Sequence, residues 1–216
     1  RGLVAKMPDG VELVADAWLP PSGGPWPVLL QRLPHGRAVA SSPVLPHPVH
    51  LARAGHAVVS QDSRGRGDSG GTFAPFVNEA ADGEASIAWA AGLDFCDGRG
   101  ATYGFAYQGM AQLLAAARRP PELWAIAPMQ CAAGPYEGWT YHGGCLALPF
   151  AAPWAAQLAG QQPGVREPEV DLEALPLAAA LGDRPPRWWT NWLAHPEPGL
   201  WWEHRSADLT AITVPA

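Results

Sequence analysis

The sequence is poor in charge, and it has no long apolar run. Only 16% of its 216 residues are charged, the net charge is −6, and lysine and arginine form no basic block. Without such a block there is no electrostatic footprint for a nucleic acid, whose binding depends on phosphate contacts. No apolar stretch reaches the roughly 20 residues that a membrane-spanning helix needs. We therefore expect neither a nucleic-acid partner nor a membrane partner.

Cysteine is scarce as well. Cys96, Cys131 and Cys145 are an odd number of thiols, and none belongs to a C-x-x-C pair. This usage indicates free thiols in a reducing compartment, so we expect a cytoplasmic protein. The opening residues, RGLVAKMPDG, are neither a signal peptide nor a methionine start, and the closing residues, LTAITVPA, stop where a strand is expected to begin. Both ends are expected to adjoin further chain.

Proline, glycine and tryptophan, by contrast, are abundant, with 24, 24 and 11 residues. Frequent proline predicts short elements and fixed turns, because proline neither continues a helix nor donates to a sheet. So many tryptophans are compatible with an aromatic-lined pocket, an apolar face that a partner covers, or plain core packing. Trp188 and Trp192, four residues apart, are expected on one face of a helix.

Strand and helix patterns alternate through the first 133 residues. Apolar runs and apolar–polar alternation predict strands at 10–20, 27–32, 56–62, 101–105 and 123–129. Helical spacing predicts helices at 47–55, 78–95 and 110–119, the second of them capped by Asn78. This alternation is typical of an α/β domain with a largely parallel sheet. From residue 134 the sequence predicts an irregular, mostly helical insertion, before the chain returns to a strand at 209–215.

The six residues GFAYQG (104–109) lie between a predicted strand and a predicted helix. A glycine-flanked turn at this place is where an α/β-hydrolase holds its nucleophilic serine. Small neighbours permit the sharp turn, and the following helix offers N–H groups and partial positive charge to an oxyanion. The usual pattern is G-x-S-x-G, whereas this sequence has Ala106 in the centre and Gly109 one place later. An alanine methyl group cannot attack a carbonyl.

Other local patterns are weaker. GRGDSG (65–70) matches the dinucleotide-binding letters, but the glycine and proline that follow exclude the helix that this site needs. His47 and His50 are a candidate metal pair without a third ligand nearby in sequence, so surface or structural roles are favoured. Three further serines lie on no elbow and are poor substitutes for a nucleophile: Ser60, Ser63 and Ser69. We expect no metal and no cofactor.

Seven segments carry a family resemblance through their order and spacing: MPDGVELVADAWLP, LQRLPHGR, VVSQDSRGRGDSGGTF, NEAADG, DGRGATYGFAYQGMAQLLAA, LWAIAP and YEGWTYHGG. The set resembles the cocaine esterase-like (CocE/NonD) acyl hydrolases, relatives of X-prolyl dipeptidyl peptidases and α-amino acid ester hydrolases. The resemblance implies an α/β-hydrolase fold with an inserted helical cap, incomplete because only the N-terminal half of the sheet is present. The implied domains are the first part of the hydrolase core (1–133), the cap (134–207) and the start of the return to the core (208–216).

The resemblance assigns roles to four positions. The family's serine falls at Ala106, and the backbone N–H of Tyr107 is the implied first oxyanion donor. The second donor, a tyrosine hydroxyl in the family, falls at His35, whose imidazole still offers a hydrogen bond. Trp139 matches a cap tryptophan that walls the acyl pocket. The family's triad aspartate and histidine cannot be placed on this sequence.

Three interpretations follow. The first is an acyl esterase or amidase whose nucleophile position holds alanine, by engineering or by natural loss. The second is a natural non-hydrolytic member that binds or transforms a small acyl or aromatic ligand in a biosynthetic pathway, which the change at His35 favours. The third is a scaffold that uses a tryptophan-rich surface.

The expected partners are a small-molecule acyl ester or amide and the remaining C-terminal segment of the same protein, and a homo-oligomer is left open. Half a parallel sheet has an exposed edge and an uncovered face. Residues 1–216 alone are therefore not expected to be a stable monomer.

Overall fold

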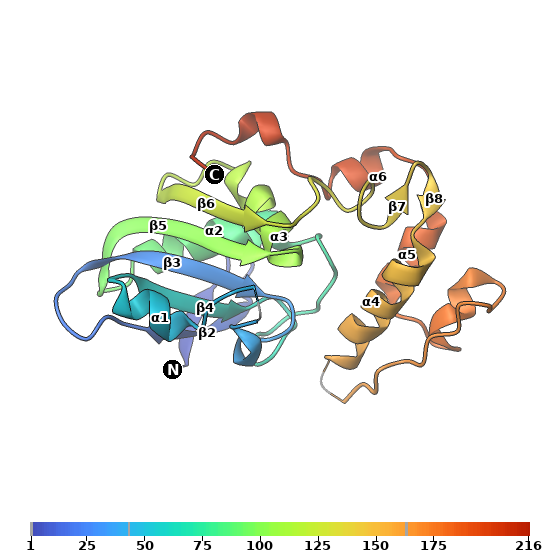
Figure 1. Ribbon diagram of the computed structural model, residues 1–216, viewed down its shortest axis with the longest axis horizontal. Coiled ribbons are helices and arrows are strands. Elements are labelled where there is room, and N and C mark those ends of the chain that lie inside the picture. The colour runs from blue at the N-terminus through green and yellow to red at the C-terminus, as the bar shows by residue number, and fades with distance from the viewer. Residues whose placement is uncertain (1, 43, 163) are drawn as a thin grey trace. The chain divides into compact units, whose positions relative to one another are not determined.

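The computed structural model describes residues 2–42, 44–162 and 164–216, and the chain divides into two compact units (Figure 1). The first unit holds residues 1–133 and 207–216, and the second holds Gly134–Ser206. Each unit has its own buried side chains. No helix in the described ranges is long and apolar enough to cross a membrane.

The first unit is built on a six-stranded sheet with the order β1-β2-β4-β3-β5-β6. The strands are β1 (Leu3–Lys6), β2 (Glu12–Trp18), β3 (Trp26–Leu33), β4 (Ala57–Asp62), β5 (Cys96–Phe105) and β6 (Leu123–Met129). β2 pairs antiparallel with β1 and β4, whereas β4, β3, β5 and β6 are parallel neighbours. The predicted α/β fold with a largely parallel sheet is therefore confirmed, and the carboxyl ends of four strands share one edge.

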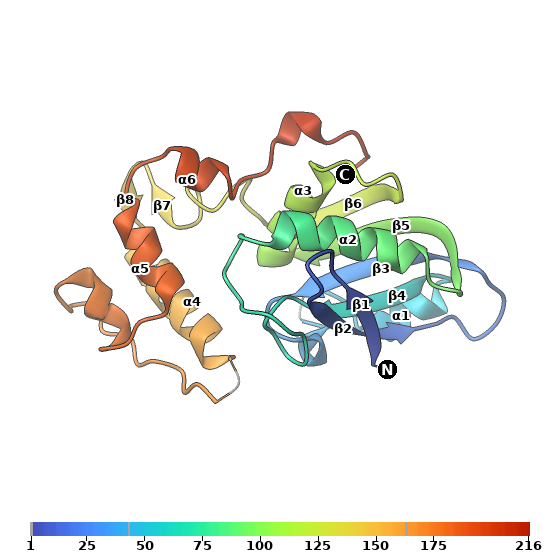
Figure 2. The same ribbon diagram turned by 180° about the vertical axis from the view of Figure 1, so that it is seen from behind.

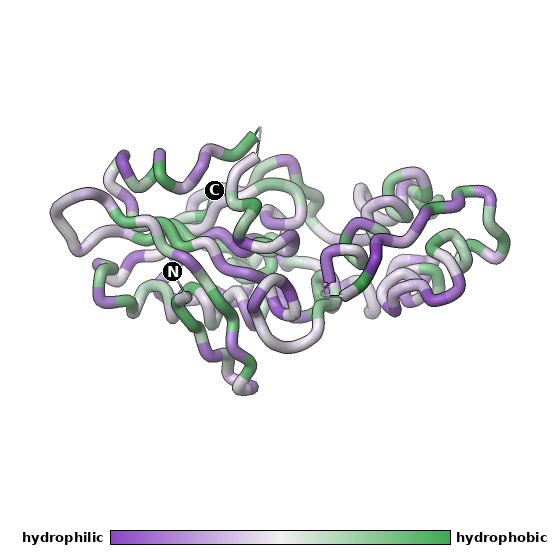
Figure 3. The backbone as a smooth tube through the Cα atoms, turned by 90° about the horizontal axis from the view of Figure 1, so that it is seen from below, coloured by the Kyte–Doolittle hydropathy of each residue, from purple (hydrophilic) through white to green (hydrophobic). Residues whose placement is uncertain are grey.

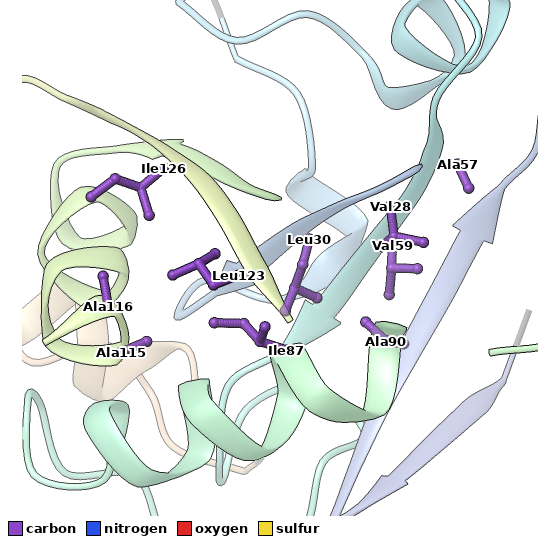
Figure 4. Close-up of a cluster of buried hydrophobic side chains, with 11 residues drawn as sticks. Val28, Leu30, Ala57, Val59, Ile87, Ala90, Ala115, Ala116, Leu123 and Ile126 are labelled. Carbon is purple, nitrogen blue, oxygen red and sulfur yellow. The ribbon is translucent and has the colours of Figure 1, made fainter. Parts of the chain in front are cut away.

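Three helices cover this sheet: α1 (Pro48–Arg53), α2 (Glu79–Ala91) and α3 (Tyr107–Ala116). Figure 2 shows α2 and α3 side by side on one face, while α1 lies on the other. Gly83 lets α2 approach α3, because a Cβ there would lie 2.6 Å from the Ala115 Cβ. The core between sheet and helices is made of small and branched apolar side chains (Figure 4), namely Ala15, Val28, Leu30, Ala57, Val59, Ile87, Ala90, Ala115, Ala116, Leu123 and Ile126.

The central strands change from apolar to polar toward their carboxyl ends. All six residues of β4 are buried, although its last three are polar, and Gln31 and Arg32 are buried near the end of β3. Figure 3 shows hydrophobic stretches within this sheet beside hydrophilic ones. Buried polar groups need hydrogen-bond partners. These strand ends therefore hold the loops that follow them in place.

The second unit joins a short hairpin to several helical segments. They are β7 (Tyr141–His142), β8 (Cys145–Leu146), α4 (Leu148–Gly160), the 3₁₀ helix η2 (Leu177–Leu181), α5 (Arg187–Ala194) and α6 (Leu200–Glu203). Its core is aromatic: Trp189, Trp192 and Trp202 are at most 2% exposed, and Trp192 stacks on Trp154 with ring centres 5.6 Å apart. Trp188 and Trp192 are both buried on α5, as their spacing predicts. Much of the tryptophan therefore stabilises the interior of this unit.

Several boundary predictions in the first unit are wrong, among them the end of the helix expected at 78–95, which stops at Ala91. The helix expected at 110–119 begins earlier, at Tyr107, because β5 ends in a one-residue turn. Asn78 precedes α2, but it has helical backbone angles (φ −103°, ψ −4°), and its side chain makes no capping hydrogen bond to the described residues. The acidic Glu79 and Asp82 in the first turn favour this helix start instead.

The strand expected at 209–215 is also wrong. The 3₁₀ helix η3 (Leu209–Ala211) stands there, and no strand follows it among the described residues. The cause is local, because the Asp208 carboxylate accepts the Thr210 N–H at 3.0 Å and caps a helical turn. The segment still reaches the sheet, since the Ile126 N–H of β6 donates to the Pro215 carbonyl at 3.0 Å.

Candidate active site

Figure 1 shows β5 and α3, and a single strained residue joins the end of β5 to the start of α3. This residue, Ala106, has φ 53° and ψ −120°, a conformation that side-chain-bearing residues avoid. Such strain costs roughly 1–3 kcal/mol and persists only where the surroundings impose it. Here the Ala106 N–H donates to the Met129 carbonyl at 2.9 Å, and the Ala106 carbonyl accepts the Gly109 N–H at 3.0 Å. The turn is therefore held by the neighbouring strand and by the helix that follows.

Each of the two glycines of GFAYQG permits a close contact that a Cβ atom would block. Gly104 has φ 149°, and a Cβ there would lie 2.5 Å from Oε1 of Gln108, so the Gln108 side chain folds over the bare glycine. A Cβ on Gly109 would lie 2.8 Å from the Cβ of Cys131, which follows β6. The second glycine thus allows α3 to start tightly against the end of β6.

Tyr107 anchors the first turn of α3 in the core. It is 2% exposed, its hydroxyl donates to the Glu79 carboxylate at 2.8 Å, and its ring stacks on Phe76 with centres 4.6 Å apart. Arg32 pairs with the other Glu79 oxygen at 2.5 Å. Burial first, and then the Glu79 charge, raises the pKa of Tyr107 well above its ordinary value. The phenol is thus a neutral anchor for the first turn of α3.

His35 lies in the turn that follows β3 and is half-buried. Gly36, with φ 89°, leads into the 3₁₀ helix η1 (Arg37–Val39). The Arg37 N–H donates to the Asp62 carboxylate at 2.5 Å, so the end of β4 holds this turn. The Arg37 guanidinium contacts three carboxylates, those of Asp16, Asp62 and Asp68.

The sheet brings His35 and Ala106 to one edge. β3 and β5 are parallel neighbours, and each of these residues follows the carboxyl end of its strand. In open α/β sheets ligands bind at this edge. The sequence places both residues after strands, but only the strand order makes those strands adjacent.

Two of the three alternative serines, Ser60 and Ser69, have structural side-chain hydrogen bonds. Ser60 is fully buried and donates to the Gln31 side chain at 3.2 Å. Ser69 donates to the Asp62 carbonyl at 2.9 Å. Ser63 is fully buried as well, and its hydroxyl has no hydrogen-bond partner among the described residues. Each of the three lies away from the strained turn in sequence and from the start of a helix.

The nucleotide and metal patterns also have local explanations. Residues 65–70 form a loop in which the Gly65 N–H donates to the Gly70 carbonyl at 2.8 Å, and a loop rather than a helix continues from it. His47 caps α1, because its Nδ1 accepts the Val49 N–H at 3.2 Å. Within the described ranges no group of three or more His, Cys, Asp or Glu side chains could hold a metal ion.

A hollow of about 420 Å³ lies in the first unit on the α1 side of the sheet. It is lined by aliphatic side chains such as Leu29, Leu45 and Met129, with Tyr103 as its aromatic member, and it reaches Gly104 before the turn. The hollow on this face of the first unit is therefore mainly aliphatic rather than aromatic.

Trp139, the remaining predicted site residue, belongs to the second unit. It is 8% exposed and meets Phe150 and Trp154 edge to face, with ring centres 5.2 and 5.1 Å apart. It is thus part of an aromatic cluster whose outer member, Phe150, is 44% exposed. A role as the wall of an acyl pocket stays a prediction.

Sequence reasoning missed the buried polar side chains that hold the site. Asp62 fixes the His35 turn, Glu79 fixes Tyr107, and Gln31 bonds to Gln108 at 3.1 Å beneath the strained turn. The available signal was polar residues inside otherwise apolar runs, as in PVLLQR (27–32) and AVVSQD (57–62). A polar residue in a buried strand indicates a partner, although it does not name one.

Comparisons with known proteins agree with this geometry. The family model for X-Pro dipeptidyl-peptidase (S15 family) matches residues 9–216. Cocaine esterase from Rhodococcus sp. (strain MB1 Bresler) is 35% identical over 187 residues, which cover 84% of this chain and 33% of that protein.

Among solved structures, an aminopeptidase from the marine sediment archaeon Thaumarchaeota archaeon has a TM-score of 0.83 at 22% identity, covering 100% of this chain and 41% of its own. A CocE/NonD family hydrolase from Staphylococcus aureus also has a TM-score of 0.83 at 22% identity, covering 100% and 39%. The chain thus spans well under half the length of these relatives. It has the N-terminal part of an α/β-hydrolase fold and belongs to the X-Pro dipeptidyl-peptidase (S15) family.

Proposed function

We propose that this chain carries the nucleophile elbow and the oxyanion donors of an ester- or amide-hydrolysing enzyme, with alanine in place of the nucleophilic serine. The observation that carries the proposal is the backbone of Ala106, with φ 53° and ψ −120° at the strand–helix junction. Glycine would adopt these angles without strain. A strained alanine supports an elbow whose surroundings are arranged to expose one short side chain at the edge of the sheet.

The chemistry of such a site needs three parts. A serine at residue 106 would attack the acyl carbon, and the Tyr107 N–H and the His35 imidazole would donate to the oxyanion. The triad aspartate and histidine would come from chain outside residues 1–216. With alanine at residue 106 the acyl-enzyme cannot form, and loss of the nucleophile typically costs about 10⁶-fold in rate. The substrate would be a small acyl ester or amide.

The test is Ala106→Ser in the full-length protein, assayed on a broad panel of acyl esters and amides. We expect at least about 10³-fold more hydrolysis than the parent on some member of the panel, since the nucleophile accounts for the largest share of the rate. Ala117→Ser, at the far end of α3, is the matched control that adds a hydroxyl away from the elbow. A panel on which Ala106→Ser and Ala117→Ser are equally inactive would overturn the proposal.

A second candidate, favoured by His35, is a natural member that binds the acyl or aromatic ligand without hydrolysing it. Two departures from the family then share one oxyanion site, which a single inactivation of the nucleophile does not explain. The discriminating variant is Ala106→Ser with His35→Tyr. If only this double variant hydrolyses esters, His35 has diverged together with Ala106, and the non-hydrolytic role is supported. Full activity of Ala106→Ser alone would refute that role.

A further inference from the structure

A cluster of buried polar side chains lies beneath the strained turn. Gln31 and Ser60 are fully buried on β3 and β4, while Tyr103 on β5 and Gln108 on α3 are 9% and 7% exposed. They come from four elements that meet below residue 106. Buried polar groups of this kind persist when each finds a partner, and such networks specify one arrangement of the groups that they join.

The Gln31 amide is the centre of the cluster, and all four of its hydrogen-bonding positions are used. Its Oε1 accepts from the Ser60 hydroxyl and the Tyr103 hydroxyl, each at 3.2 Å. Its Nε2 donates to the Ala40 carbonyl at 3.2 Å and to Oε1 of Gln108 at 3.1 Å. The oxygen thus joins the amide to the sheet, while the nitrogen reaches two segments outside it.

Those two segments carry the two oxyanion donors of the proposed function. Ala40 closes the turn that begins at His35. Gln108 is in the first turn of α3, directly after Tyr107, and its side chain is folded over Gly104 toward Gln31. The side-chain NH₂ group of Gln31 therefore connects the turn that contains His35 to the first turn of α3, which contains Tyr107.

We propose that Gln31 is a positioning residue, which sets the His35 imidazole and the Tyr107 N–H relative to each other through its two Nε2 hydrogen bonds. The inference rests on the proposed function. An apolar side chain of the same length would fill the space and leave both segments unlinked. A misplacement of about 1 Å in a catalytic group lowers the rate by about 10²-fold.

The experiment compares Gln31→Met with Gln61→Met, each in full-length protein carrying Ala106→Ser. Gln61 is also fully buried, but its side chain accepts from Arg32 and Ser86. We expect Gln31→Met to lower kcat by about 10²-fold with KM within about threefold, because the oxyanion forms only after binding. Gln61→Met is expected to leave kcat within about threefold. Equal kcat values for the two variants would overturn the positioning role while leaving the proposed function intact.

A second readout does not depend on catalysis. In the full-length parent, with Ala106 in place, Gln31→Met is expected to speed amide hydrogen exchange at residues 36–40 by about tenfold or more, because the Ala40 carbonyl loses its tie to β3. Gln61→Met is expected to leave that segment unchanged. An inactive Ala106→Ser enzyme would overturn the proposed function. Unchanged amide exchange at residues 36–40 in Gln31→Met would, independently, overturn the link between Gln31 and the His35 turn.

If Gln31→Met does not fold, Gln108→Met replaces it, since it removes only the α3 acceptor of the Gln31 amide. The same fall in kcat at constant KM is then expected. A Gln108→Met enzyme with the kcat of the Ala106→Ser parent would count against the positioning role.

Discussion

Replacing Ala106 with glycine is expected to stabilise the protein, although glycine usually destabilises. At φ 53° and ψ −120° an alanine bears about 1–3 kcal/mol of strain that glycine does not. Against this, glycine adds unfolded-chain entropy worth about 0.5–1 kcal/mol. The Ala106 methyl is only half-buried, so little apolar contact is lost. The free energy of unfolding should therefore rise, by up to about 2.5 kcal/mol.

Ala117→Gly is the matched control, because Ala117 ends the same helix with ordinary angles (φ −61°, ψ −19°). Only the entropy difference acts there, and stability should fall by about 0.5–1 kcal/mol. Urea denaturation of the full-length parent and both variants measures the two changes, which should have opposite signs. If both variants lose stability to the same extent, Ala106 carries no strain, and the reasoning that makes it an elbow is refuted.

Gly83→Ala should lower the free energy of unfolding by about 1–3 kcal/mol, because the added Cβ would lie 2.6 Å from the Cβ of Ala115. Adding Ala115→Gly should recover part of this loss, as measured by thermal denaturation. A Gly83→Ala protein as stable as the parent would show that α2 and α3 are not in close contact. Burial and the Glu79 charge raise the pKa of Tyr107 in the folded state. Above about pH 10 the phenol therefore ionises only in the unfolded chain. The free energy of unfolding then falls by about 1.4 kcal/mol for each pH unit because of this one group. Tyr107→Phe should lessen the loss of stability between about pH 9 and about pH 11. Equal losses in parent and variant would contradict the buried neutral phenol.

The buried polar side chains beneath the candidate site have structural roles. Asp62, Glu79 and Gln31 are each at most 4% exposed, and each holds a segment that carries a predicted site residue. A buried carboxylate or amide without partners would destabilise the fold, so these side chains are retained where a loop must be held. The carboxyl ends of the strands thus combine a rigid sheet with turns that are tied to it.

Several elements could be predicted because their signals are local. The apolar run at 123–129 has the same bounds as β6, and the run at 56–62 lies within one residue of β4. β1 was missed because LVAK is too short to show a period, and the start of β5 was missed because CDGRG is rich in turn-forming residues. Those segments become strands through pairing with a neighbour, and a single sequence does not display that pairing.

The sequence by itself determined the class of fold, the family resemblance and the position of the strand–helix turn, because apolar periodicity and the glycines of GFAYQG act over a few residues. Only the tertiary structure decided that Ala106 is strained, since Met129 from β6 supplies the hydrogen bond that holds it. The strand order likewise brought His35 to the same edge. Contacts between residues distant in sequence, such as Gln31 with Gln108, depend on how the strands are ordered, and that order arises only when the whole sheet buries its apolar faces.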